Sequence, residues 1–203
     1  KFLAGSWRFN TYFGRDTLMS VRLLMPALRP AAVEAGLNSV MARLSPGGEV
    51  AHEEGIGEFA VLQNRKAGRD GDAAELDYGM VDDDYMLGVV AADYLQGPGQ
   101  ARARSWLAQP LASESQPGTR TSTGAMLVRN LRFVLTQSRP FAAAPSAKTL
   151  IAIKPGRMTG EWRDSNEGLG GGVYAYDVNA TLVPAAIEAA DRLYRAGLLD
   201  PYL

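Results

Sequence analysis

Helical segments of two kinds alternate along this sequence. Residues 17–28 ("TLMSVRLLMPAL") and 84–95 ("DYMLGVVAADYL") are apolar on almost every face, which is typical of a helix that is buried all round. Residues 31–44 and 119–138 carry a single apolar stripe, as a helix with one solvated face does. Residues 180–196 are again richly apolar at their start. We therefore expect an all-α fold in which inner helices are shielded by outer ones.

Local signals predict where these segments end. Pro26 should kink the first segment or end it early. Asn179 is a natural N-cap for the last segment, and Gly197 is a natural C-cap. Strand signals are few, and "TLIAI" at 149–153 is the best of them. Polar, glycine-containing stretches indicate surface connections at 64–77 and 108–122.

Composition excludes several classes of protein. The 203 residues are 46% hydrophobic, which is enough for the core of one domain. The formal net charge of -1 gives no electrostatic reason to expect nucleic acid or an anionic membrane as a partner. No apolar run reaches membrane-spanning length. The absence of cysteine excludes disulfides and cysteine-ligated zinc, and a single histidine disfavours a multi-histidine metal site or a Ser-His-Asp triad.

Polar clusters stand just before each of the segments expected to be buried. They are "FGRD" at 13–16, "DYGMVDDD" at 77–84 and "GEWRDSNEG" at 160–168. If the buried helices run parallel, their N-terminal ends gather these clusters at one end of the molecule. Helix N-termini also direct unpaired N–H groups there. We therefore expect a polar site at that end.

These clusters resemble motifs of a known superfamily, and they occur in the family's order. "FGRDTLMS" resembles the "GRDT" segment in the glucosidase domain of glycogen debranching enzymes. "YGMVDDDYML" resembles their "MVD" segment, and "GEWRDS" resembles their "G-W-x-D" loop. The chain thus resembles the six-hairpin glycosidases, closest to debranching enzymes and glucoamylase-like hydrolases.

The resemblance implies a fold. It is an (α/α)6 toroid of twelve helices, with the active site where the N-termini of the inner helices meet. The chain looks like roughly the first half of such a barrel, so residues 1–203 would form one partial catalytic domain. The opening "KFLAGSWRFN" reads like the middle of a longer protein, and the remainder of the barrel is expected from the same protein.

The resemblance also implies an activity, the hydrolysis of α-linked glucosides or oligosaccharides with inversion. Such chemistry needs two carboxyl groups that flank the scissile bond. Asp164 matches the family's general acid, with Glu161 as its main rival and Glu167 as a weaker one. The partner base lies outside this chain, and no organic cofactor or metal is implied. Trp162 would supply an apolar wall that raises the pKa of the acid, so Arg163 is expected to point to substrate or to Glu161.

Further residues are candidates for substrate binding. Arg15 and Asp16 match family positions that grip the hydroxyls of the non-reducing glucose. His52 and Glu53 belong either to a hydrogen-bonding group near the substrate or to a solvated charge run. Asp82 best matches the family within the run 82–84, which could equally be a calcium site, a sugar clamp or a helix-start acid cluster. Asn179, with Asp177, precedes the last apolar segment and carries the same alternatives.

Other functions stay open at this point. The 160–171 segment is also compatible with an ordinary glycine-rich surface loop. The same ring of helices hosts sugar phosphorylases and lyases, but a phosphorylase needs a basic phosphate pocket and no cluster of Lys and Arg stands out. A carbohydrate-binding or structural helical domain without activity is the second alternative, because the base is not in this chain.

Overall fold

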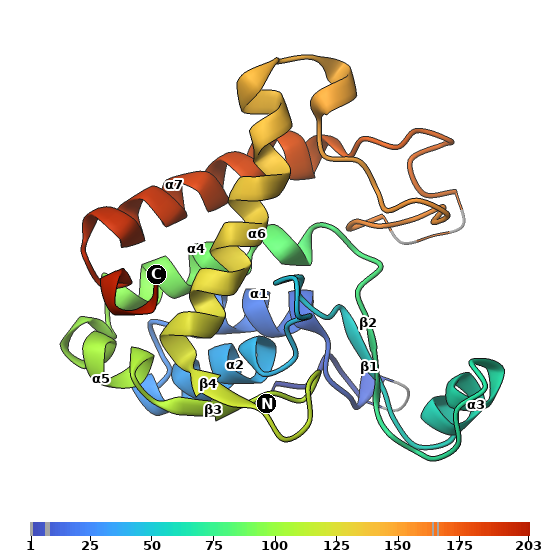
Figure 1. The fold of residues 1–203 in the computed structure, drawn as a ribbon, viewed down its shortest axis with the longest axis horizontal. Helices are drawn as coiled ribbons and strands as arrows, with labels where there is room; N and C mark the ends of the chain where they lie inside the picture. Colours follow the sequence, from blue (N-terminus) through green and yellow to red (C-terminus); the bar gives the residue numbers. More distant parts are fainter. Residues whose placement is uncertain (1, 7–8, 164, 166) are drawn as a thin grey trace.

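The computed structural model describes residues 2–6, 9–163, 165 and 167–203, and it is a helical fold with a few short strands (Figure 1). The helices are α1 (Gly14–Leu24), α2 (Pro30–Met41), α3 (Glu58–Lys66), α4 (Leu87–Leu95), α5 (Ala103–Leu107), α6 (Thr123–Ala143) and α7 (Val183–Arg195). The strands are β1 (Glu53–Gly55), β2 (Glu75–Asp77), β3 (Pro110–Ala112) and β4 (Arg120–Ser122). Within the described residues these strands form two antiparallel pairs, β1–β2 and β3–β4, and no closed sheet.

Helices α1, α4 and α7 form a row, with α4 packed against both of the others. All three run from right to left in Figure 1, so their N-terminal ends lie on the same side of the molecule. Helix α4 is buried on most of its faces, as its sequence predicts. The row thus gathers the polar segments that precede these helices at one end.

Helices α2 and α6 lie on one side of this row. Helix α2 packs against α1 and α4, and α6 packs against α4 and α7; both are drawn in front of the row in Figure 1. Helix α2 begins with Pro30 at its first position, where the missing N–H costs nothing. Helix α6 begins at Thr123 and is capped by Ser122, whose hydroxyl accepts the backbone N–H of Ala125 at 3.2 Å. The described residues therefore form two helical layers.

The two end helices of the row are less buried than the sequence predicts. Helix α1 was expected to be buried all round, but Leu23 is 74% exposed and Met19 is 39% exposed. Helix α7 buries one stripe, formed by Ala186, Ala189, Ala190 and Leu193. The physical reason is position: α4 has neighbours on both flanks, whereas in the described chain α1 and α7 each have one flank without a helix.

The start of α1 depends on a close backbone approach. Gly14 begins the helix, and its N–H donates to the carbonyl of His52 at 2.7 Å. A Cβ at this position would lie 2.4 Å from the carbonyl oxygen of Ala51, so only glycine fits without a shift. The helix ends at Leu24, two residues before Pro26, as predicted.

The predictions around the last helix were right at one end and wrong at the other. Gly197 follows α7 with a φ of 63°, which confirms it as the terminating residue. Asn179 is not an N-cap: it lies in a π-helical turn, Val178–Leu182, that precedes α7. Its side chain binds the backbone N–H and carbonyl of Ile151, each at 2.8 Å. Residues 149–153 do not form the predicted strand, since they belong to neither of the strand pairs in the described part of the chain.

Both of the expected surface connections are mostly exposed, as predicted, and both contain secondary structure. Helix α3 and strand β2 lie within or beside 64–77, and with β1 they form an arm that extends from the body at the lower right of Figure 1. The connection 108–122 contains the β3–β4 hairpin. The strands in these connections were not predicted, because three-residue strands carry little periodicity and are defined by their pairing with other residues.

Candidate functional site

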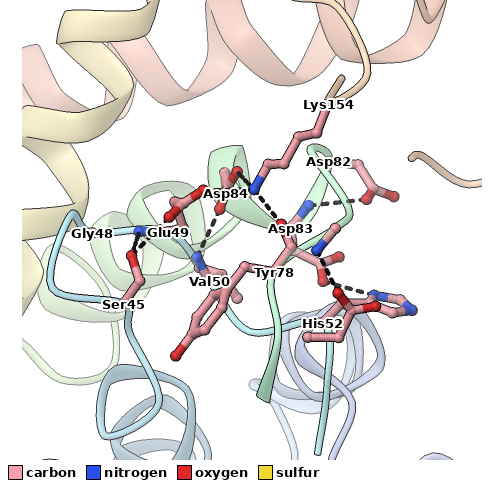
Figure 2. A network of polar contacts seen from close by, with 12 residues as sticks. Ser45, Gly48, Glu49, Val50, His52, Tyr78, Asp82, Asp83, Asp84 and Lys154 are labelled. Carbon is pink, nitrogen blue, oxygen red and sulfur yellow. Dashed lines mark hydrogen bonds and ion pairs between the residues drawn. The ribbon is translucent and has the colours of Figure 1, made fainter. Parts of the chain in front are cut away.

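Three consecutive carboxylates stand at the front of α4 and form the centre of the network in Figure 2. Asp82, Asp83 and Asp84 are each at most 2% exposed. A 3-10 turn, η2 (Asp83–Tyr85), carries them, and the Asp82 side chain caps it by accepting the N–H of Asp83 at 3.1 Å. Because successive side chains of such a turn point in different directions, the three carboxylates reach three different partners.

The first two carboxylates each bind a side chain from a distant part of the sequence. Asp82 accepts a hydrogen bond from the guanidinium of Arg15 at 2.8 Å. Asp83 lies 2.8 Å from Nδ1 of His52. These contacts join the first turn of α1 and the segment before β1 to the front of α4. Adjacent buried carboxylates repel each other and have lost their water, so positively charged or hydrogen-bonding partners are needed to stabilise them.

Asp84 is held from the opposite side. Its Oδ1 accepts the N–H of Val50 at 2.7 Å, and its Oδ2 lies 3.6 Å from Nζ of Lys154. Figure 2 shows Lys154 reaching down into the network from the segment that leads to the 160–171 loop. Its ammonium also donates to Glu49 at 2.8 Å and to the carbonyl of Tyr78. Lys154 therefore fastens this segment to the acid cluster.

Burial raises the pKa values of Asp82 and Asp84 towards neutral pH. Burial raises the pKa of Asp84 to about 8, although Lys154 and the N–H of Val50 oppose the shift. Burial and the neighbouring charge of Asp83 raise the pKa of Asp82 to about 6, against the lowering effect of Arg15. At pH 7 Asp84 is therefore mainly protonated and Asp82 mainly ionised.

His52 belongs to this network and is 8% exposed. Burial acts to lower its pKa, but the hydrogen bond that His52 makes to the carboxylate of Asp83 and the charges of Asp83 and Asp82 outweigh burial, so the pKa of His52 is raised. Its ring packs against Phe13 in a T-shaped arrangement, with centroids 5.6 Å apart. Its backbone N–H donates to Asp77 at 2.7 Å, so the residue is fixed on several sides.

The loop that begins at Gly160 lies directly against the acid cluster. The carbonyl of Gly160 accepts the N–H of Val81 at 2.7 Å. The guanidinium carbon of Arg15 lies 5.5 Å from the centroid of the Trp162 ring, within the range of a cation–π contact. Arg15 thus contacts both Asp82 and Trp162. The three motif segments meet at this residue.

Beside Arg15 and Trp162 lies a hollow of about 280 Å³, here called the first hollow. Its apolar wall comes from α1, the residue before α4 and the π-helical turn, and consists of Met19, Leu23, Met86 and Leu182. Its polar side chains are Arg15, Arg22, Asp82 and Asp177. Trp162 completes the lining and is 61% exposed.

A second hollow of about 390 Å³ adjoins the first, since Trp162 and Asp177 line both. The rest of its lining is Glu161, Arg163, Leu169, Gly172, Tyr174 and Tyr176. Glu161 is 1% exposed, and its Oε1 has no hydrogen-bond partner within the described residues. A buried carboxylate oxygen without a partner is costly to folding, which is a common mark of a functional position.

The structure brings together many of the residues predicted from the sequence. Arg15, Asp82 and Trp162 line the first hollow, and Glu161, Trp162 and Arg163 line the second. Arg163 was expected to point to substrate or to Glu161; it is exposed at the second hollow and makes no hydrogen bond or ion pair among the described residues. Asp164, the predicted general acid, lies outside the described residues.

The other predicted residues do not line either hollow. Asp16 lies in the first turn of α1 and is half-buried. Glu53 lies in β1, where burial raises its pKa. His52 is one layer deeper, behind Asp83. Asn179 uses its amide on the backbone of Ile151 and Ala175.

Several residues of the site were not predicted. Lys154 directly follows the apolar run "LIAI", and a single lysine in that position belongs to no motif that would indicate a function. Met19, Leu23, Met86 and Leu182 look like core residues in the sequence, and only the arrangement of helices places them at a hollow. Tyr174 and Tyr176 did leave a signal, because two aromatic residues in "VYAYD" directly follow the glycines of the loop.

Comparison with protein-family models gives no match, and a search of curated proteins also gives none. The described residues contain no group of three acidic or histidine side chains arranged to hold a metal ion, because the acid cluster splays towards three separate partners. No helix in the described part of the chain has the length and hydropathy needed to cross a membrane.

Proposed function

We propose that this chain is part of a glycoside hydrolase that acts on α-linked glucosides with inversion, built on a six-hairpin (α/α)6 toroid. One observation carries the proposal: Arg15, Asp82 and Trp162, which come from three motifs spread over 148 positions of the sequence (15 to 162), converge at one hollow. The row α1, α4 and α7 would supply three inner helices of the toroid, and α2 and α6 two outer ones.

The reaction needs a proton donor and an activated water. The acid donates its proton to the glycosidic oxygen as the bond from that oxygen to the anomeric carbon breaks. A base removes a proton from water, and the water oxygen bonds to the anomeric carbon from the opposite face. Asp164 is the proposed acid, and the base would come from outside this chain. In an inverting enzyme the two carboxyl groups lie about 6.5–9.5 Å apart, so a base at that separation from the acid is part of the proposal.

Glu161 is the rival acid, and its environment supports it. Its side chain is 1% exposed beneath the second hollow, beside Trp162, and one of its oxygens has no internal partner. Asp164 and Glu161 are therefore tested together.

The test is hydrolysis of maltose, isomaltose and trehalose by the natural protein that carries these 203 residues. General acid catalysis contributes about 10²–10⁴-fold to the rate, so we expect a loss of that size in either Asp164→Asn or Glu161→Gln, and the variant that shows it identifies the acid. Glu188→Gln is the matched control, because Glu188 is exposed on α7 and lines neither hollow, so this variant should keep the wild-type rate. Unchanged turnover in both Asp164→Asn and Glu161→Gln would refute the assignment.

A second function is favoured by one feature, the exposed aromatic side chains of the second hollow. Trp162 is 61% exposed, Tyr174 is 40% exposed and Tyr176 is 84% exposed. Aromatic rings with a solvated face suit binding to the apolar face of a sugar. A carbohydrate-binding domain without activity would bind the same sugars, lose affinity in Trp162→Ala, and release no glucose.

A further inference from the structure

The loop that begins at Gly160 is joined to the front of α4 by three contacts that precede it or open it. The ammonium of Lys154 lies among acceptors at the acid cluster, the guanidinium of Arg157 donates to Asp77 at 2.7 Å, and the carbonyl of Gly160 accepts the N–H of Val81 at 2.7 Å. The pair of Arg157 and Asp77 is largely exposed, and ion pairs in contact with water contribute little. Of the two cations, Lys154 is therefore the one whose contacts can fix the segment.

The surroundings of Lys154 are matched to an ammonium group. Its three N–H bonds are directed among Glu49 at 2.8 Å, the carbonyl of Tyr78, and Asp84, whose Oδ2 lies 3.6 Å away. These acceptors come from three segments: the chain between α2 and β1, the residue after β2, and η2. One side chain thus ties the segment before the loop to three parts of the body, as Figure 2 shows.

The group to which Lys154 is tied is itself rigidly held. Asp84 is buried, its Oδ1 accepts the N–H of Val50 at 2.7 Å, and its backbone carbonyl accepts the amide of Asn130 on α6 at 3.1 Å. Asn130 is also buried and donates to the carbonyl of Gly48 at 2.9 Å. Because these contacts join the front of α4, α6 and the chain before β1, a group bound at Asp84 is fixed relative to the body.

A compact turn connects Lys154 to the loop. The N–H of Arg157 donates to the carbonyl of Lys154 at 3.1 Å, which closes the turn. Ile153 is buried and packs so closely on Gly160 that a Cβ on the glycine would lie 3.0 Å from the isoleucine side chain. The start of the loop therefore moves with Lys154. The two residues that follow Gly160 line the hollows.

We infer that Lys154 is a positioning residue, whose ammonium group determines the position of Glu161 and Trp162 at the two hollows. The inference rests on the proposed function where it concerns catalysis, because an acid in this loop has to meet the glycosidic oxygen. It also makes a claim about the loop alone, which can be tested without a substrate. Loss of the ammonium group releases the segment from the acid cluster, so the contact between Arg15 and Trp162 weakens.

The first test is fluorine NMR of the natural protein labelled with 5-fluorotryptophan, in which Trp162→Phe and Trp106→Phe assign the two resonances. Trp106 is fully buried in the core, so its resonance shows whether a variant is folded. In Lys154→Met we expect the Trp162 resonance to move or broaden while that of Trp106 stays in place. Lys154→Arg keeps the charge and several donors, so its Trp162 resonance should lie closer to that of the wild type. An unmoved Trp162 resonance in folded Lys154→Met overturns the inference.

Two further variants complete this test. Lys148→Met is the matched control, because Lys148 is exposed, precedes the same segment and lines neither hollow. A Trp162 shift as large in this control as in Lys154→Met would overturn the inference. If Lys154→Met does not fold, Glu49→Gln decides, since it removes the charge of the nearest partner and keeps an acceptor oxygen. The Trp162 resonance should move in that variant, and an unmoved resonance would then overturn the inference.

Turnover of maltose and isomaltose is measured in parallel, so that the two proposals fail separately. A displacement of about 1 Å can cost about 10²-fold in rate, so Lys154→Met should lower kcat by about that factor, and Lys154→Arg by less. A lowered kcat with an unmoved Trp162 resonance contradicts the positioning role, and a moved resonance with an unchanged kcat contradicts its part in catalysis. If the wild type releases no glucose, the hydrolase is contradicted, and the Trp162 resonance still decides whether Lys154 positions the loop.

Discussion

The raised pKa of Asp84 predicts a dependence of stability on pH that is opposite in sign to that of most aspartates. In the native protein this pKa is about 8, because the side chain is buried at the front of α4, whereas the ordinary value is 3.8. The native state therefore binds the proton more tightly than the unfolded chain does. Stability contributed by this proton is fully present below pH 3.8 and is lost as the pH rises towards 8.

The size of the effect follows from the two pKa values. Between pH 5 and 7 the unfolded chain has ionised Asp84 and the native protein has not, so each pH unit costs about 1.4 kcal/mol of unfolding free energy. Over this interval the loss is about 2.7 kcal/mol. Asp84→Asn cannot ionise, and its amide oxygen can still accept the N–H of Val50. The free energy of unfolding of the variant should therefore fall less steeply between pH 5 and 7 than that of the wild type, by about 1.4 kcal/mol per pH unit.

The assay is urea unfolding followed by far-ultraviolet circular dichroism at pH 5, 6 and 7. The wild type also carries slopes of the same sign from the raised pKa values of Asp82 and His52, so the quantity that tests Asp84 is the difference between wild type and Asp84→Asn. Asp72→Asn is the control, because Asp72 is exposed and its substitution removes one negative charge without changing the acid cluster. A wild type as stable at pH 7 as at pH 5, or a variant with the wild-type slope, would refute the reasoning.

Two further substitutions test the packing of the site. Gly14→Ala places a Cβ 2.4 Å from the carbonyl oxygen of Ala51 and should lower the free energy of unfolding in urea by about 1–3 kcal/mol. The control is Gly47→Ala, which should change this free energy little because no neighbour lies closer than 3.6 Å to its Cβ. Equal effects of the two substitutions would contradict the close approach at Gly14. Arg15→Met removes the ion-pair partner of the buried Asp82 and should lower the free energy of unfolding by about 3–5 kcal/mol at pH 7. At pH 4, where Asp82 is protonated, the same urea measurement should show a clearly smaller loss. A loss that does not change with pH would exclude the ion pair as its cause.

The sequence predicts those parts of the fold that local periodicity encodes. Helix α4 is apolar on nearly every face in the sequence and is buried on most faces in the structure. The polar clusters before α1 and α4 predict a shared site, and Arg15 and Asp82 do meet there. These predictions succeed because a helix fixes the direction of its own N-terminus, so parallel packing is enough to gather the clusters.

What the sequence does not predict depends on contacts between distant residues. Lys154 lies 70 positions after Asp84, and nothing in either segment indicates that they meet. The three-residue strand β2 has no periodicity of its own and is defined by its pairing with β1. The exposure of Leu23 on α1 could not be predicted either, because an apolar residue type does not show whether its neighbour is a helix, a ligand or water.

The charges of the acid cluster also define the pH range in which the site is organised as described. The ion pair between Arg15 and Asp82 requires an ionised Asp82, and so a pH above about 6. Below that value Arg15 loses its counter-charge and with it part of the support for its contact with Trp162. Above about 8 the ionisation of Asp84 places further negative charge in a buried turn that already holds two other carboxyl groups. The organised site thus belongs to the interval between these limits, and within it stability already falls with pH. Of the three carboxylates only Asp82 is among the described residues that line a hollow, so a change in its charge is the change of the cluster that a ligand in the first hollow would meet directly.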